Sequence, residues 1–251
     1  LKGRFILTAG FMKQNIYDRE DFYNAYLKLR ESGAGINESL EQPTVRSLLP
    51  ELNGLEVLDL GCGYGENCVW YVDQDAKRVV GVDISKRMIE AAEMRFPNSQ
   101  IEYLCQAFED YAYPEDAFDV VVSSMAMHYI SVFDAVVAGV YKTLKFGGVF
   151  VFSQEHPMVS ARKVEKGWVV DDRGEKKFLP VDNYHVQGRR EDSGWLVGGA
   201  VKYHRTIEAM VASLLNTGYA IDGIREPGLD LLEDDSNRRP PIIVFKGRKG
   251  Q

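Results

Sequence analysis

The chain has 251 residues, of which 45% are hydrophobic and 27% are charged, and its formal net charge at pH 7 is −7. This composition is typical of a globular protein that can bury a core without disulfides or metal ions, so residues 1–251 are expected to form one domain. The acidic charge disfavours nucleic acid as a partner, and no apolar stretch is long enough for a bilayer, so no membrane association is expected.

The cysteines indicate a compartment. Cys62, Cys68 and Cys105 are odd in number and lack the paired spacing of metal sites. They are typical of free thiols in a reducing environment, and we therefore predict a cytoplasmic location. Residues 1–12 lack a complete signal-peptide pattern and are left out of the interpretation.

Two helices are predicted before the first strand. Apolar residues, among them Phe22 and Tyr26, recur at helical spacing within residues 21–30, and a second short helix is predicted over residues 40–49. Because this part is amphipathic and aromatic, residues 13–50 are predicted to form a helical lid over a binding site. Packing in a core would explain Phe22 and Tyr26 equally well.

Short apolar strands then alternate with helices. The predicted strands are Glu56–Leu60, Arg78–Asp83, Ile101–Cys105, Phe118–Ser123, residues 149–153, Tyr219–Arg225 and residues 242–246. One predicted helix follows residues 61–65 and ends near Asp73. Three others cover Lys86–Arg95, residues 133–144 and residues 206–216. Strands that are apolar on both faces and alternate with helices indicate a parallel sheet covered on both sides. The predicted fold class is therefore α/β, with a doubly wound, mostly parallel seven-stranded sheet.

One stretch breaks this alternation. Residues 156–203 are rich in glycine, aromatic and charged residues and repeat with neither period. We interpret them as a substrate-cap insertion over the ligand-binding edge of the sheet. Residues 56–153 are then the cofactor-binding core, and residues 205–248 supply a C-terminal helix and the last two strands.

The first strand leads into a glycine-rich loop. The loop reads Gly61-Cys62-Gly63-Tyr64-Gly65, and the next strand ends at Asp83. Glycines let a backbone turn tightly and approach a ligand, and a carboxylate in this place can accept both hydroxyls of a ribose. A strand, a glycine loop, a helix and a strand ending in an acid predict a nucleoside site. Alternatively, the glycines form only a turn and Asp83 only caps the next helix.

These motifs resemble those of a known family. Residues 57–65 resemble the first motif of class I S-adenosylmethionine-dependent methyltransferases, and residues 81–85 resemble the second. Residues 118–123 and 144–148 are similar to the fourth strand and the turn before the fifth. The resemblance covers about residues 56–153 and implies a Rossmann-like fold.

Motifs of the second half resemble a small-molecule branch of this family. They are similar to motifs of enzymes related to the ubiquinone/menaquinone and biotin-pathway methyltransferases. The segments that carry this similarity are residues 153–157, 203–206, 226–227 and 238–240, with Asn37 and residues 41–43. No acceptor common to the whole branch follows from it.

The resemblance implies a cofactor, S-adenosylmethionine, with S-adenosylhomocysteine as product. Gly61 and Gly63 would lie against its methionine part, and Asp83 would hold the ribose. The sequence lacks the Asp that many members carry at Ala107, so adenine recognition would fall to backbone groups and Gln106. The full set of predicted cofactor residues is Asp59, Gly61, Cys62, Gly63, Asp83, Ile84, Met88, Gln106, Ala107, Phe108, Ser124 and Met125.

Candidate catalytic residues follow the fourth and fifth strands. Methyl transfer is an in-line displacement, and alignment in a dry pocket can supply much of the rate, so a base is needed only if the acceptor must lose a proton. His128 follows the fourth strand, and His156 follows the fifth beside Glu155. For His128 a purely structural role is the favoured alternative, and for His156 the two readings weigh equally. The long separations of the four histidines predict no metal site.

Substrate-binding candidates come from the lid and the insertion. Aromatic rings supply the wall of a small-molecule pocket, and arginine can clamp a carboxylate or phosphate. Alternatively, these rings form the core of the insertion and the arginines face solvent. The candidates are Tyr17, Tyr26, Tyr184, Arg189, Arg190, Trp195 and Arg205.

The sequence therefore predicts methyl transfer from S-adenosylmethionine to an oxygen, nitrogen or carbon of a small molecule, by a monomer or homodimer. One alternative is an NAD-dependent oxidoreductase, although its glycine spacing usually differs from that of residues 61–65. Another is a non-catalytic S-adenosylmethionine-binding regulator. A nucleic-acid methyltransferase is disfavoured, because residues 123–126 do not resemble the Asn/Asp-Pro-Pro-aromatic run used for base methylation.

Overall fold

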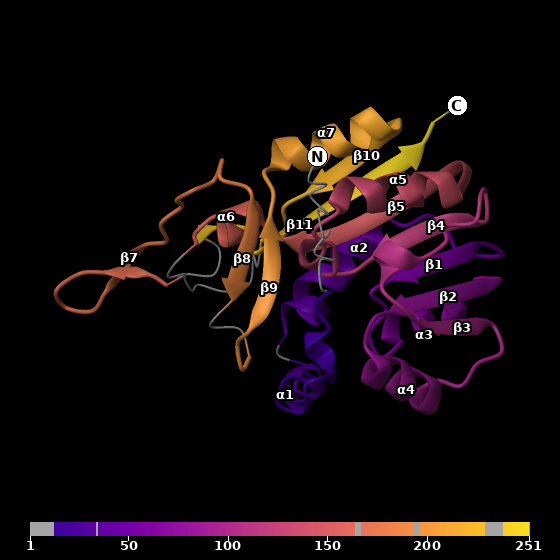
Figure 1. Cartoon of the computed structure of the whole chain (residues 1–251), viewed down its shortest axis with the longest axis horizontal. Helices are drawn as coiled ribbons and strands as arrows, with labels where there is room; N and C mark the ends of the chain where they lie inside the picture. The colour runs from indigo at the N-terminus through magenta and orange to yellow at the C-terminus, as the bar shows by residue number, and fades with distance from the viewer. Residues whose placement is uncertain (1–12, 34, 164–166, 193–195, 229–237, 251) are drawn as a thin grey trace, which may run out of the picture.

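A single seven-stranded sheet forms the centre of the protein in a computed structural model that describes residues 13–33, 35–163, 167–192, 196–228 and 238–250. Its strand order is β10-β11-β5-β4-β1-β2-β3 (Figure 1). The strands are β1 (Glu56–Leu60), β2 (Arg78–Asp83), β3 (Ile101–Cys105), β4 (Phe118–Ser123), β5 (Leu144–Glu155), β10 (Tyr219–Arg225) and β11 (Ile242–Lys249). The predicted doubly wound, mostly parallel sheet is confirmed, since only β11 runs antiparallel to its neighbours β5 and β10.

Alternating side chains bury both faces of this sheet. In β1, Leu58 and Leu60 lie in one core and Val57 lies in the other. The first core also holds α5 (Phe133–Thr143) and α7 (Ile207–Thr217), as the apolar faces of these helices require. The second holds side chains of α2 (Gln42–Leu48), α3 (Glu66–Asp73) and α4 (Lys86–Arg95). Each face is therefore covered by its own layer of helices.

The N-terminal segment, residues 13–50, differs in detail from the prediction. It contains a 3-10 turn (η1, Ile16–Asp18), α1 (Glu20–Glu31), a π-helical turn (η2, Asn37–Glu41) and α2. A single helix over residues 40–49 was expected. Pro43 has no N–H to donate to the carbonyl four residues earlier, and the N–H of Gln42 instead donates to the carbonyl of Asn37.

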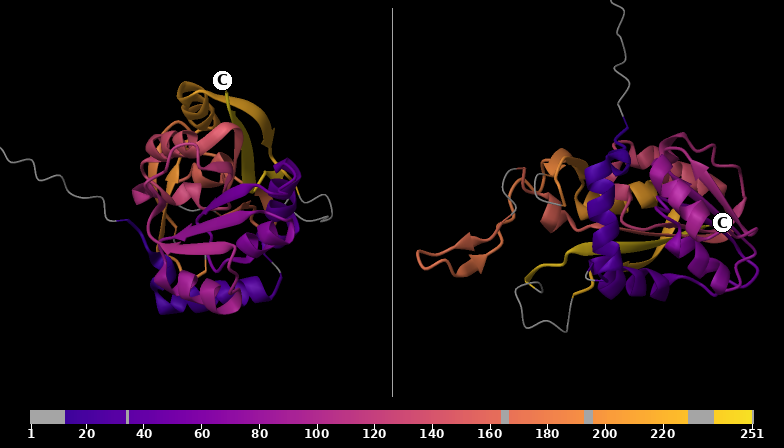
Figure 2. Two further views of the ribbon diagram at one scale, coloured as in Figure 1. Left: turned by 90° about the vertical axis from the view of Figure 1, so that its right-hand side faces the viewer. Right: turned by 90° about the horizontal axis from the view of Figure 1, so that it is seen from below.

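Two small hairpins lie outside the main sheet. They follow the short α6 (Pro157–Ser160) and pair β6 (Val169–Val170) with β7 (Lys176–Phe178), and β8 (Gly188–Asp192) with β9 (Ala200–His204). Figures 1 and 2 show the first hairpin projecting away from the rest of the protein. These elements explain why residues 156–203 showed no single period, because each strand is short and two of them, β6 and β7, are exposed throughout.

The predicted turn at Gly147-Gly148 falls inside β5. The pairing register between β4 and β5 shifts after Phe118, and Gly147 has a φ of +76° there. The chain thus bends without leaving the sheet. In the part of the chain that the structure describes, no helix is both long and apolar enough to cross a membrane.

Candidate functional site

A cavity of about 1200 Å³ opens where the parallel strands end. Its wall combines the loops after β1, β2 and β4 with the end of β5, the N-terminal segment and residues 156–203. The strand order reverses between β1 and β4, and ligands of open α/β sheets bind at such a point. Pockets for one small ligand measure roughly 300–1,000 Å³, and this cavity is somewhat larger than that range.

The glycine loop, residues 61–65, requires its first two glycines for different reasons. Gly61 has a φ of +81°, and a Cβ on it would lie 2.5 Å from the Cβ of Ala126. Gly63 has a φ of +55°, but a Cβ there would meet nothing within 4 Å. Gly61 therefore lets two loops meet, whereas Gly63 leaves its backbone open to the cavity.

Asp83 connects the glycine loop to the turn after β2. Its Oδ2 accepts a hydrogen bond from the Gly63 N–H at 2.9 Å, and its Oδ1 accepts one from the Ser85 N–H at 2.8 Å. Burial raises the pKa of Asp83 to about 6, although these two N–H groups oppose the shift. Helix α4 is capped by Ser85, whose Oγ accepts from the Met88 N–H. Asp83 is thus more than a helix cap, and it also lines the cavity.

Most of the other predicted cofactor residues lie together at this end. Those that line the cavity are Cys62, Ile84, Met88, Ala107, Phe108, Ser124 and Met125. Asp59 and Gln106 do not line it. Asp59 is fully buried, where its Oδ2 accepts from the Cys68 thiol, and burial raises its pKa to about 7. The N–H of Gln106 donates to the carbonyl of Asp83, so the Gln106 backbone pairs with the end of β2.

His128, which follows β4, and Glu155, the last residue of β5, also line the cavity, and we call this part of the wall the acceptor end. His128 is 3% exposed, and its Nδ1 accepts from the Glu155 N–H at 3.4 Å. The neutral ring then carries its proton on Nε2. The Glu155 Oε1 accepts from the Lys202 Nζ at 2.8 Å, and its buried Oε2 has no hydrogen-bond partner among the described residues. This end therefore presents an imidazole ring and a carboxylate oxygen without a hydrogen-bond partner among the described residues.

The structure gives His156 a different environment from the one predicted. Its Nδ1 accepts from the Met158 N–H at 3.0 Å and caps α6, and its Nε2 lies 2.7 Å from Glu226 Oε1. Burial lowers the pKa of His156 despite the carboxylate beside it. Both ring nitrogens are engaged, and the residue does not line the cavity.

The substrate-binding candidates also separate into two groups. Tyr17, Tyr26 and Arg189 line the cavity. Tyr184 and Arg190 do not line it. The Tyr184 hydroxyl accepts from the Ile207 N–H, and the guanidinium of Arg190, 3% exposed as a residue, donates to the carbonyls of Ser160 and Ala161.

Arg205 and Trp195 complete that set. The Arg205 guanidinium lies 4.8 Å from the centre of the Phe133 ring, donates to the Tyr203 carbonyl, and does not line the cavity. Burial lowers the pKa of Arg205 to about 10. Trp195 lies outside the described residues. Arg205 is thus engaged within the fold, like Tyr184 and Arg190.

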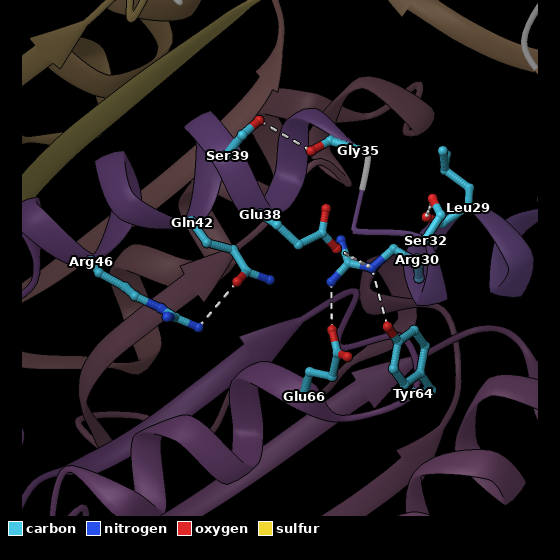
Figure 3. Close-up of polar contacts among 10 residues, drawn as sticks. All are labelled: Leu29, Arg30, Ser32, Gly35, Glu38, Ser39, Gln42, Arg46, Tyr64 and Glu66. Carbon is cyan, nitrogen blue, oxygen red and sulfur yellow. Dashed lines mark hydrogen bonds and ion pairs between the residues drawn. The ribbon is translucent and has the colours of Figure 1, made fainter. Parts of the chain in front are cut away.

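Arg30 was not predicted as a site residue, yet it lines the cavity beside the glycine loop. Its Nε lies 3.1 Å from both the Tyr64 hydroxyl and Glu38 Oε1, and its Nη2 lies 2.5 Å from Glu66 Oε2 (Figure 3). No motif marks this residue, because its position depends on how α1 packs near the start of α3. Other wall residues absent from the predicted set include Asn37, Gln42, Tyr129, Trp168, Lys176, Tyr203 and Arg239.

Within the described ranges, no group of three or more His, Cys, Asp or Glu side chains is placed to hold a metal ion. The three cysteines are free thiols.

Comparisons with known proteins identify the class to which this architecture is similar. Residues 58–152 match the family model for a methyltransferase domain. A Listeria monocytogenes structure assigned as an S-adenosylmethionine-dependent methyltransferase is 37% identical, with a TM-score of 0.79, over 84% of this chain and 98% of that one. An S-adenosylmethionine-dependent methyltransferase structure from Mesorhizobium loti is 34% identical, with a TM-score of 0.78, over 85% and 100%.

A further relative matches over a shorter stretch. The malonyl-[acyl-carrier protein] O-methyltransferase of Acetivibrio thermocellus is 32% identical over 52% of this chain and 44% of its own length. The chain therefore spans less than half of that relative, and the similarity between the two is partial.

Proposed function

Because the chain belongs to the S-adenosylmethionine-dependent methyltransferases, we propose that it methylates a small molecule bound at the acceptor end of the cavity. The observation that carries this proposal is the single cavity that joins the glycine loop and Asp83 to His128 and Glu155. S-adenosylmethionine supplies an electrophilic methyl group on a sulfonium. The protein contributes alignment of the two ligands and exclusion of water.

The sequence resemblance, the enzyme class and S-adenosylmethionine as cofactor are all confirmed by two relatives that match along their whole length. These comparisons do not favour the NAD-dependent oxidoreductase. They do not favour a regulator that binds the cofactor without turnover either, and a methyl-transfer assay distinguishes such a regulator from an enzyme.

For the cofactor we propose a place along the first two strand ends. Gly63 leaves room for a ligand, and Asp83 has lone pairs beyond those used by its two backbone N–H partners. Ile84 and Met88 would flank the adenine. Arg30 carries a guanidinium beside the glycine loop, which suits the carboxylate of the methionine part.

We propose that the N-terminal segment acts as the lid. It is held to the sheet's ligand-binding edge at separate points, which supports this role. Asp18 Oδ1 accepts from the Ser85 hydroxyl at 2.6 Å and from the Arg87 N–H at 3.1 Å, at the start of α4. Arg30 binds Glu66 at the start of α3. Tyr17 and Tyr26 face the cavity between these points.

For the acceptor we propose an anionic molecule with an apolar or aromatic body. The net charge of the chain is −7, yet Arg189, Arg239 and Lys176 are among the residues that line the cavity. Lys176 lies 5.3 Å from the centre of the Trp168 ring, which also lines the cavity. Cations beside an aromatic wall favour a carboxylate or phosphate attached to such a body. Residues 156–203 would then act as the substrate cap.

At the reacting atom we propose that Glu155 Oε2 accepts a hydrogen bond from the acceptor and that the His128 ring positions the backbone of Glu155. The unpartnered buried oxygen of Glu155 supports the first role. The second follows from the Nδ1 contact with the Glu155 N–H. Direct removal of a proton by Nε2 would require the other ring tautomer. Alignment therefore carries more of the proposed catalysis than general base action.

Partners and location remain proposals. We propose a monomer or homodimer, and on the basis of the acidic charge we propose that nucleic acid is not a partner. The three free thiols support the cytoplasm, a reducing compartment.

Calorimetric titration with S-adenosylmethionine, S-adenosylhomocysteine and NAD tests the cofactor site, followed by a methylation screen of acceptors in pairs. Each pair contains a carboxylate and its neutral amide on the same ring. We expect binding of the first two ligands, no binding of NAD, and turnover of the carboxylate member. Turnover confined to neutral amides would contradict the proposed acceptor class.

A further inference from the structure

Glu41, the last residue of the π-helical turn η2, is an acidic side chain with no exposure to solvent. Burying a carboxylate is costly unless it is hydrogen-bonded or paired. Glu41 does not line the large cavity, but the next residue, Gln42, does. A costly buried acid therefore sits directly behind the cavity wall.

The contacts of Glu41 join three parts of the chain. Its Oε1 accepts hydrogen bonds from the Ser124 hydroxyl at 2.7 Å and from the Ser153 hydroxyl at 2.5 Å. The Ser153 oxygen in turn accepts from the Met125 N–H at 2.9 Å. One carboxylate oxygen thus connects the N-terminal segment to the end of β4, to β5 and, through Ser153, to the backbone of Met125.

The loop that receives these bonds, residues 124–126, forms part of the cavity wall. Met125 has a φ of +50°, a left-handed conformation that persists in a non-glycine residue only when its surroundings fix it. Ala126 packs against the glycine loop so closely that Gly61 admits no Cβ. The shape of the cavity beside the glycine loop therefore depends on what holds residues 124–126.

We propose that Glu41 is a positioning residue of the cofactor site. Its carboxylate holds residues 124–126 against the glycine loop and ties them to the N-terminal segment. Cofactor affinity then depends on a side chain that does not line the cofactor cavity. This inference rests on the proposed function, because it takes the cavity to be the cofactor site.

The ionisation of Glu41 is consistent with this geometry. Burial raises its pKa, whereas the two serine hydroxyls and the more distant Arg30 and Arg46 lower it. The two hydroxyl donors need an oxygen acceptor, which a carboxylate and a carboxamide both provide. Glu41→Gln therefore retains the proposed role, and Glu41→Ala removes it.

The test is calorimetric affinity for S-adenosylhomocysteine, measured together with thermal unfolding. We expect Glu41→Ala to weaken affinity by about 10-fold or more, as loss of one or two charge-assisted hydrogen bonds predicts, and Glu41→Gln to restore it to within about threefold of the natural protein. The matched control is Val45→Ala, a core truncation in α2 of the same segment. It should lower stability and leave affinity within about twofold.

If Glu41→Ala does not fold, Ser153→Ala removes the bridge to Met125 and leaves Glu41 bonded to Ser124. The same direction of change in affinity is expected. Unchanged affinity in folded Glu41→Ala or Ser153→Ala would overturn the inference, and so would an equal loss of affinity in Val45→Ala. In either case, binding of S-adenosylhomocysteine by the natural protein would leave the proposed function intact. Failure of the natural protein to bind S-adenosylhomocysteine would overturn both.

Discussion

Replacing Asp83 by alanine tests the cofactor site most sharply, because its carboxylate is 9% exposed and already joins two turns. If it also accepts the two ribose hydroxyls, Asp83→Ala removes hydrogen bonds to a charged group worth about 1.5–3 kcal/mol each. Water that hydrogen-bonds to the groups left by the removed carboxylate offsets part of this loss of binding free energy. We therefore expect affinity for S-adenosylhomocysteine to fall by about 2–4 kcal/mol, or about 30- to 700-fold in Kd.

The assay compares S-adenosylhomocysteine with an analogue that lacks the ribose hydroxyls, in the natural protein and in Asp83→Ala. The ribose hydroxyls should contribute to affinity only when the Asp83 carboxylate is present. The loss of affinity from removing the hydroxyls and the loss from Asp83→Ala should therefore not add. Asp59→Asn is the matched control, since Asp59 is another buried carboxylate near the glycine loop that does not line the cavity. Its Kd should stay within about threefold of the natural value.

The pKa of Asp83 predicts a pH dependence as well. Hydroxyl donors stabilise the ionised carboxylate, and burial places its pKa at about 6. Affinity should therefore weaken as pH falls through about 6, and Asp83→Asn should lack this dependence. Additive losses in the comparison, or a Kd unchanged by Asp83→Ala, would refute the ribose assignment.

Three further predictions follow from the described contacts. Burial raises the pKa of Asp59 from its ordinary value to about 7, so the stability it contributes is present at low pH and is lost as pH rises toward 7. Thermal unfolding should show that fall in the natural protein, and an Asp59→Asn variant that shows the same fall would contradict it. His156→Ala should cost about 0.5–2 kcal/mol of stability through loss of the α6 cap, and the Kd for S-adenosylhomocysteine should stay unchanged, since a weaker Kd would place His156 in the site. Arg239→Gln should raise the KM of an anionic acceptor about 10-fold and leave cofactor affinity unchanged, and an equal effect on a neutral acceptor would argue against the charge assignment.

Five of the seven strands could be predicted residue by residue because they obey local rules, whereas β5 and β11 are longer than predicted. Strands such as Arg78–Asp83 and Phe118–Ser123 are apolar on both faces and are bounded by turn residues, so their limits coincide with the predicted ones. The hairpins within residues 156–203 obey no such rule. Their strands have between two and five residues and depend on pairing and side-chain contacts that no local pattern encodes.

The candidate site divides in the same way. Gly61, Gly63 and Asp83 follow strand ends, and topology alone brings strand ends together. His156 and Arg190 occupy suggestive places in the sequence, but their actual partners are an acid 70 residues away and carbonyls about 30 residues away. Long-range packing decides such roles.

Arg30 and Glu41 illustrate the opposite error. An arginine in an amphipathic helix is ordinarily exposed, and an acid near a predicted helix start is ordinarily solvated. Here the N-terminal segment packs against the ends of the strands, and both side chains are buried by it. The sequence predicted a helical N-terminal segment over the site, but which of its side chains reach the polar wall depends on how its helices pack.

The most direct test of the account is transfer of a radiolabelled methyl group from S-adenosylmethionine. The purified protein would be incubated with fractions of small molecules separated by charge, with Asp83→Ala as the inactive control. We expect label in an anionic acceptor and release of an equal amount of S-adenosylhomocysteine. Tight cofactor binding with no transfer to any small-molecule fraction would contradict it and would favour a non-catalytic regulator.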